Sequence, residues 1–218
     1  VVDSATPPTS SVTWTTVIFS ASTRLPLTIP VLKPLSVTSR SYRPSIANGN
    51  AYDPSAPVVV VRVKPRSTLV IFGDGAGAVV LEPVTEGGFL GSELGADGGG
   101  GIHLCYPGSG SRHFDNPDSI LKMNGREVFK FATRVMVSSA EAVLEQCGKT
   151  IEDIDVYVPH QANKRIIDYA TGKLGIPPER TIVNVDRYGN TSSGSIPLAL
   201  ADARAAGLLT DGALVLMT

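Results

Sequence analysis

The sequence predicts a layered α/β fold over residues 58–218, preceded by an irregular segment over residues 1–57. Two observations support this prediction. The composition changes near residue 57, because the first 57 positions hold 8 of the 16 prolines but only 1 of the 22 glycines and 2 of the 20 acidic residues. Beyond that point, short apolar runs alternate with amphipathic stretches in the order strand, helix, strand, helix, strand, which is typical of a sheet covered by helices.

Length, charge and cysteine content limit the class of protein. The chain has 218 residues, of which 42% are hydrophobic, so it can bury a sizeable core. Its formal net charge of −1 favours neither nucleic acid nor an anionic membrane as a partner. No apolar run approaches the roughly 20 residues of a membrane-spanning helix. Cys105 and Cys147 stand in no metal-ligand spacing and predict neither a disulfide framework nor a metal site, so we expect a cytoplasmic protein.

Residues 1–57 are rich in Ser, Thr and Pro. The β-forming residues 12–19 allow one strand, but Pro26, Pro30 and Pro34 oppose both a continued sheet and a helix. A segment of this composition buries little apolar surface. We therefore expect a mostly irregular leader that packs poorly against the rest of the chain.

The elements of the remaining chain follow from apolar spacing. Residues 68–72 predict a buried strand that enters a tight glycine turn at 73–77, and residues 78–81 predict a second strand. The glycine-dense residues 87–110 predict a long surface connection. Apolar residues at three- and four-residue steps then predict a helix over 126–146, closed by Gly148. The later pattern predicts, in order, a strand at 155–159, a helix at 163–174, a strand at 181–185, a helix at 191–206 and a strand at 213–217.

His160 and Asn190 each follow a predicted strand and precede a predicted helix. Open α/β sheets bind ligands at the carboxyl ends of their strands, so both side chains are candidates for chemistry. Each also has a structural explanation, His160 as a hydrogen-bonded core histidine and Asn190 as a helix N-cap. If the two strands are neighbours, an imidazole N–H and an amide N–H point at one place, which is the arrangement of an oxyanion site.

Four ordered stretches resemble one family. They are FGDGAGA at residues 72–78, LKMNGREVFK at 121–130, VPHQAN at 158–163 and YGNTSS at 188–193. Over about residues 66–218 the chain is similar to β-ketoacyl-acyl-carrier-protein synthase III. The resemblance implies a thiolase-like fold, of which this chain carries the C-terminal half. It also implies an acyltransferase of fatty-acid biosynthesis, which condenses acetyl-CoA or another acyl-CoA with malonyl-acyl-carrier protein to give 3-oxoacyl-acyl-carrier protein.

The resemblance implies roles for individual residues. His160 and Asn190 match the catalytic pair that holds the malonyl thioester carbonyl as it becomes an enolate. The substrate-binding positions of the pantetheine tunnel match Gly125, Phe129, Ala162 and Asn163. The basic positions that bind the acidic carrier protein match Lys130, Arg165 and Lys173. A simple core position for Phe129 and a solvated surface position for Lys173 stay open.

The resemblance also implies partners. Acyl-carrier protein and acyl-CoA are expected to bind, no cofactor is expected because acyl-CoA and malonyl-acyl-carrier protein are both substrates, and the full-length family forms homodimers. The family's nucleophilic cysteine precedes the stretch that matches residues 72–78, whereas residues 1–65 contain no cysteine. Neither Cys105 nor Cys147 matches that position. We therefore expect an inactive fragment, incomplete at its C-terminus and joined to an unrelated leader.

Two alternatives stay open. The first is a non-catalytic module that binds carrier protein through its basic helix. The second is a related Cys-His-Asn synthase of the hydroxymethylglutaryl-CoA or polyketide type, which differs in its primer.

Overall fold

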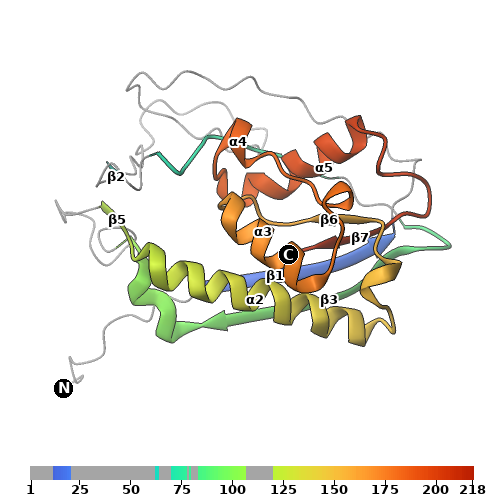
Figure 1. Cartoon of the computed structure of the whole chain (residues 1–218), viewed down its shortest axis with the longest axis horizontal. Helices are drawn as coiled ribbons and strands as arrows, with labels where there is room; N and C mark the ends of the chain where they lie inside the picture. The colour runs from blue at the N-terminus through green and yellow to red at the C-terminus, as the bar shows by residue number, and fades with distance from the viewer. Residues whose placement is uncertain (1–11, 21–61, 64–69, 78, 80–82, 107–119) are drawn as a thin grey trace, which may run out of the picture.

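A four-stranded sheet forms the centre of the molecule. The computed structural model describes residues 12–20, 62–63, 70–77, 79, 83–106 and 120–218. The strand order is β3 (Gly88–Asp97), β1 (Val12–Ser20), β7 (Leu214–Met217), β6 (Val156–Val158) (Figure 1). Strand β1 is antiparallel to β3 and β7, whereas β6 and β7 are parallel. A smaller sheet has the order β2 (Arg62–Val63), β5 (Ile120–Met123), β4 (Leu104–Cys105).

Four α-helices occur in the described part of the chain. They are α2 (Gly125–Gln146), α3 (Lys164–Leu174), α4 (Val185–Tyr188) and α5 (Ser195–Ala205). The short 3-10 helices are η1 (Gly98–His103), η2 (Ile151–Asp153), η3 (Pro178–Arg180) and η4 (Ser192–Gly194). The helices expected at 126–146 and 163–174 are confirmed to within one residue, as are the strands expected at 155–159 and 213–217. None of the described helices is both long and apolar enough to cross a membrane.

The parallel strands β6 and β7 carry apolar side chains on both faces. On one face, Tyr157 and Leu216 share a buried cluster with Val143 of α2. On the other face, Val158 and Val215 pack in a cluster with residues of α5, namely Ala199, Leu200 and Ala203. Because successive strand residues point to opposite faces, both helical layers pack on the same two strands. This packing fixes the end of β6, from which His160 emerges.

The expectation that the leader packs poorly is wrong for residues 12–20. The allowed strand is present as β1, but it lies inside the sheet between β3 and β7. Every residue except proline offers the same backbone donor and acceptor, so composition does not indicate which strands an extended segment will join. The rest of residues 1–57 lies outside the described residues.

The expected surface connection at 87–110 is also wrong, because residues 88–97 form the strand β3. The glycines of this strand allow a neighbouring helix to pack closely on it and do not mark a loop. A Cβ atom at Gly91 would lie 2.5 Å from the Sγ atom of Cys147, so the glycine lets the end of α2 rest on the strand. The strand expected at 78–81 falls largely outside the described residues.

Two further differences concern the segment that leads to α5. At 181–185 the only strand-like pairing among the described residues is a single bridge between Thr181 and Tyr157, and α4 already starts at Val185. The helix expected at 191–206 begins only at Ser195, after η4. Ser192 has a φ angle of 54°, which interrupts a regular α-helix at this point.

Candidate active site

His160 lies just beyond the carboxyl end of β6. Its backbone N–H donates to the Thr218 carbonyl oxygen at 2.7 Å, and its ring Nδ1 lies 2.6 Å from the Ser195 hydroxyl oxygen. Burial lowers the pKa of His160 below its ordinary value, so the ring is neutral near pH 7. Within the described part of the chain, Nε2 has no hydrogen-bond partner. The ring is therefore anchored through one nitrogen and open at the other.

Gln161 braces the segment next to His160. Its side chain is 1% exposed, and its amide NH₂ donates to the carbonyl oxygens of Pro159 at 2.8 Å and Ile182 at 3.0 Å. Its Oε1 accepts the backbone N–H groups of Asn184 at 2.8 Å and Val185 at 3.2 Å. The buried Gln161 amide thus accepts the backbone N–H groups of residues 184 and 185, which in a longer strand would bond to a neighbouring strand. These bonds connect this segment to the end of β6.

Asn190 lies on the loop between α4 and η4. Its backbone N–H donates to the Ile71 carbonyl oxygen at 2.8 Å, and its own carbonyl oxygen accepts the Gly73 N–H at 3.0 Å. The side-chain Oδ1 accepts the Ser192 N–H at 2.9 Å, but the N-cap of η4 is Thr191 and that of α5 is Gly194, so the expectation of Asn190 as a helix N-cap is wrong. Its side-chain NH₂ has no partner among the described residues. The bond through Oδ1 orients the amide and leaves its NH₂ available as a donor.

The glycine turn at 73–77 packs against the backbone of the loop that carries Asn190. A Cβ atom at Gly73 would collide with the Tyr188 carbonyl oxygen, so only glycine allows this approach. The Asn190 loop is also linked to His160, because Ser195 begins the helix five residues after Asn190 and binds the imidazole. Convergence of the two side chains on one ligand atom stays a prediction.

The residues matched to the pantetheine tunnel lie at the start of α2 and just before α3. Phe129 and Ala162 pack against the buried cluster of Met136, Ile166 and Ala170. Asn163 is the N-cap of α3, its Oδ1 accepting the Arg165 N–H at 2.9 Å. Gly125 is the first residue of α2, and no atom lies within 4 Å of the position of a Cβ atom there. Phe129 is half-buried against this cluster, and its place in a substrate tunnel stays a prediction.

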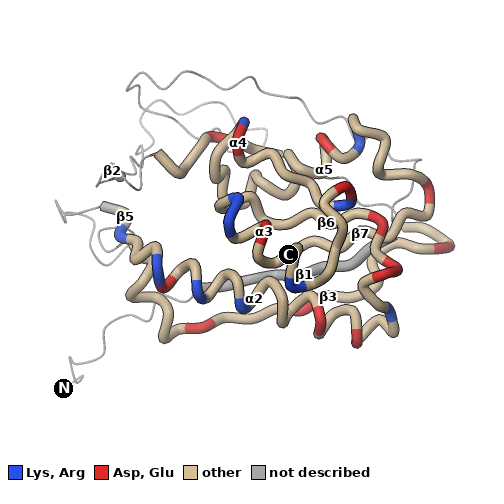
Figure 2. Tube along the Cα trace, viewed as in Figure 1, with Lys and Arg blue, Asp and Glu red and all other residues tan. Residues whose placement is uncertain are grey.

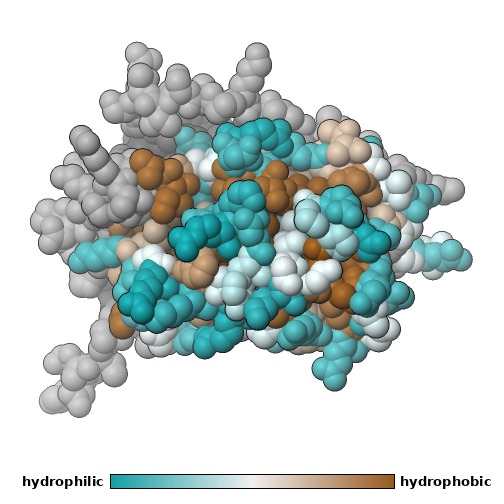
Figure 3. All heavy atoms as spheres, viewed as in Figure 1, coloured by the Kyte–Doolittle hydropathy of each residue, from teal (hydrophilic) through white to brown (hydrophobic). Residues whose placement is uncertain are grey.

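The basic residues lie along α2 and α3 (Figure 2). Lys130 pairs with Glu127 at 2.8 Å, and the Arg165 guanidinium lies 5.5 Å from the centre of the Phe129 ring. The Lys173 ammonium lies 5.9 Å from the centre of the Tyr169 ring. Hydrophilic residues predominate on the face shown in Figure 3, with apolar patches between them.

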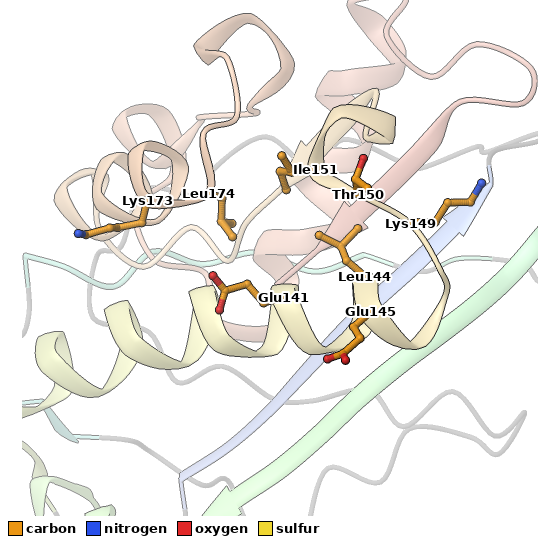
Figure 4. Close-up of a pocket in the computed structure, with 8 residues that line it drawn as sticks. All are labelled: Glu141, Leu144, Glu145, Lys149, Thr150, Ile151, Lys173 and Leu174. Carbon is orange, nitrogen blue, oxygen red and sulfur yellow. The ribbon is translucent and has the colours of Figure 1, made fainter.

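Two shallow cavities open between α2 and α3. One, of about 410 Å³, is lined by residues that include Lys130, Arg134, Tyr169 and Lys173. The other, of about 340 Å³, lies between the C-terminal part of α2 and the end of α3, with Glu141 on one wall and Lys173 on the other (Figure 4). Neither cavity includes His160 or Asn190, so they mark a surface and not the candidate oxyanion site.

Comparison with known proteins identifies the family. The model described as 3-oxoacyl-[acyl-carrier-protein (ACP)] synthase III C terminal matches residues 144–218, and the model described as 3-oxoacyl-[acyl-carrier-protein (ACP)] synthase III matches residues 56–98. Together these matches cover more than half of the chain. It belongs to the 3-oxoacyl-[acyl-carrier-protein] synthase III family.

Relatives of known sequence and structure agree with this membership. A β-ketoacyl-[acyl-carrier-protein] synthase III of Symbiobacterium thermophilum is 53% identical over 163 residues, which are 72% of this chain and 49% of the relative. The crystal structure of the synthase III of Pseudomonas aeruginosa is 39% identical with a TM-score of 0.63, over 71% of this chain and 48% of that one. The Thermus thermophilus structure is 44% identical with a TM-score of 0.55, over 70% and 48%. The thiolase-like fold is therefore confirmed, and the chain spans about half the length of the curated relatives that it matches.

Neither cysteine of this synthase III family member lies at the N-terminus of a described α-helix. Cys105 lies in β4, and Cys147 directly follows the C-terminal end of α2. Among the described residues there is also no group of three or more metal-ligating side chains.

Sequence reasoning missed Ser195 and Gln161 as site residues. Gln161 follows His160 directly, and this adjacency was the one available signal. Ser195 is separated from His160 by 35 positions, and nothing in its local sequence indicates a contact with the imidazole.

Proposed function

We propose that this chain supplies the His160–Asn190 oxyanion site of a decarboxylative condensation. In this reaction an acyl-CoA, such as acetyl-CoA, and malonyl-acyl-carrier protein give 3-oxoacyl-acyl-carrier protein. The observation that carries the proposal is that two side-chain nitrogen atoms, His160 Nε2 after β6 and the Asn190 amide nitrogen on the α4–η4 loop, have no hydrogen-bond partner among the described residues. Membership of the synthase III family supports the choice of reaction.

The chemistry requires hydrogen-bond donors that are already in place when negative charge develops on the thioester oxygen. When the bond between the malonyl α-carbon and the carboxylate breaks, CO₂ leaves and its bonding electron pair moves onto the thioester oxygen as an enolate. A neutral imidazole N–H and an amide N–H aimed at this oxygen stabilise it, and one such donor contributes on the order of 3 kcal/mol. The enolate carbon then attacks the carbonyl carbon of the acyl thioester, the new carbon–carbon bond forms, and the carbon–sulfur bond of that thioester breaks with the thiolate as the leaving group.

The carrier protein is proposed to dock on the face formed by α2 and α3. Lys130, Arg165 and Lys173 supply positive charge there for an acidic partner, and the cavity between the helices adjoins Lys130 and Lys173. Phe129 and Ala162 provide apolar surface beside Arg165 for the pantetheine arm. The whole protein is proposed to act as a homodimer, as the family resemblance implies.

The test uses a hybrid enzyme. The part of the Symbiobacterium relative that this chain does not match is joined to residues 56–218, and CO₂ release from malonyl-acyl-carrier protein is measured. His160→Ala and Asn190→Ala should each lower decarboxylation by about 100-fold or more while acyl transfer to the relative's cysteine persists. The buried-serine variant Ser139→Ala serves as the control. Decarboxylation that survives both substitutions would contradict the proposal.

A second candidate is a non-catalytic carrier-protein-binding module. The positions of Cys105 in β4 and of Cys147 after the C-terminal end of α2 favour it, because neither lies at the N-terminus of a described α-helix. Calorimetry of the unmodified chain with acyl-carrier protein tests this candidate. Binding that weakens in Lys130→Glu and Lys173→Glu, together with a hybrid that releases no CO₂, would favour the module over the enzyme.

A further inference from the structure

Ser195 is the residue that holds the His160 ring. It is the first residue of α5 and is 1% exposed. Its hydroxyl oxygen lies 2.6 Å from His160 Nδ1 and also accepts the backbone N–H of Gln161 at 3.3 Å. The imidazole is thus joined to a helix that starts five residues after Asn190.

The hydroxyl proton determines the direction of this hydrogen bond. A serine hydroxyl has one proton and two lone pairs, and the Gln161 N–H occupies one lone pair. Among the described residues, Nδ1 is the one acceptor within reach of that proton. If Nδ1 carried a hydrogen and donated instead, the serine proton would be buried without an acceptor, which is unfavourable.

We propose that Ser195 is a positioning residue that fixes His160 as the Nε2–H tautomer. Its O–H donates to Nδ1, so the single ring proton of the neutral imidazole is on Nε2, the nitrogen that faces away from Ser195. The inference deepens the proposed function, because the oxyanion site requires a donor at Nε2 and an imidazole of the other tautomer would present a lone pair to the enolate. The tautomer itself is a property of the resting chain.

The experiment measures the tautomer directly in the full chain. The protein is labelled with ¹⁵N-histidine, and the ring nitrogens are observed by NMR near pH 8, where the His160 imidazole is neutral because burial lowers its pKa. The chain has 3 histidines, and His160→Gln identifies the signals of His160. The wild type should show one protonated Nε2 and one unprotonated Nδ1.

Three serine variants separate positioning from packing. Ser195→Ala should lose the single tautomer and show a mixture of both, whereas Ser195→Thr keeps a hydroxyl and should restore the Nε2–H form. Ser139→Ala is the matched control, because Ser139 is 3% exposed and its hydroxyl donates to Val135 within α2. It should leave the His160 signals unchanged. Amide dispersion in the same samples reports whether each variant is folded.

Two results would overturn the inference. One is a wild-type protein in which Nδ1 carries the proton. The wild-type spectrum therefore tests the tautomer assignment even if Ser195→Ala does not fold. The other is a folded Ser195→Ala that keeps pure Nε2–H. In the hybrid enzyme, decarboxylation should fall in Ser195→Ala and recover in Ser195→Thr. An inactive wild-type hybrid whose His160 is Nε2–H would contradict the proposed function but support the tautomer assignment.

Discussion

At His160, burial and hydrogen bonding act in the same direction. Burial lowers the pKa of the ring, and the contact with Ser195 orients it, so a neutral donor stands at the end of β6. A neutral imidazole suits an oxyanion site, because it donates a hydrogen bond without placing a permanent charge in the partly buried site.

The lowered pKa predicts a dependence of stability on pH. Between the pKa of the folded state and the ordinary value of 6.5, the unfolded state binds more protons than the folded state. The free energy of unfolding should therefore fall as the pH drops below about 6.5. Urea unfolding of wild type and His160→Gln at several pH values measures this. The variant should lose less stability on acidification, and a difference that does not vary with pH would contradict the assignment.

Gln161 should contribute strongly to stability. Gln161→Leu preserves the approximate volume but leaves two backbone N–H groups and two carbonyl oxygens without their buried partner. We expect a loss of about 3–5 kcal/mol in the free energy of unfolding, measured with urea. The exposed Gln146→Leu at the end of α2 should change it by less than about 0.5 kcal/mol. Equal effects of the two substitutions would mean that the buried bonds are not formed.

At the scale of single elements, β1 can be tested by one proline. Val17 pairs with Ser92 of β3 and with Met217 of β7, so its N–H belongs to one of the two ladders. Val17→Pro removes that donor from the middle of a sheet, whereas the control Val17→Ala retains it. Hydrogen exchange should then accelerate throughout β3, because β1 is its neighbour in the sheet. Unchanged protection of β3 would show that residues 12–20 do not lie there.

Two glycines of α3 should respond in opposite directions. Gly175 ends the helix with a φ of 73°, and an alanine there should cost about 1 kcal/mol. Gly172 is exposed within the helix and has no atom within 4 Å of a Cβ position, so Gly172→Ala should stabilise by about 0.5–1 kcal/mol. Thermal unfolding measures both variants. The same sign of change at both positions would contradict the assigned end of α3.

At the scale of the whole molecule, the chain combines a formed sheet with two thiols, neither of which lies at the N-terminus of a described α-helix. We expect no stable acyl-enzyme when the purified chain is incubated with labelled acetyl-CoA, because covalent catalysis needs a thiolate activated by a helix N-terminus or a nearby base. Mass spectrometry before and after hydroxylamine treatment measures this. Stoichiometric acylation of Cys105 or Cys147 would show that one of them serves as the nucleophile.

Whole-molecule architecture also depends on a segment outside the family matches. Strand β1 lies before residue 56, where the first match begins, and yet it joins β3 to β7. The position of the domain boundary near residue 57 stays a prediction.

The sequence by itself determined the local elements and the chemistry of individual residues. Apolar spacing predicted α2, α3, β6 and β7, and the residue types at 160 and 190 indicated a donor pair. These properties depend on neighbours within one or two helical turns or along one strand, which a single sequence displays.

Only the tertiary structure decided the place of β1, the strand at 88–97 and the contacts of Ser195 and Gln161. Sheet pairing uses backbone groups that are the same in every residue, so the partners of an extended segment leave no periodic signal. The bond between His160 and Ser195 joins residues 35 positions apart. It forms because β6 and α5 pack together through Val158, Ala199 and their buried neighbours, and this packing exists only in the folded chain.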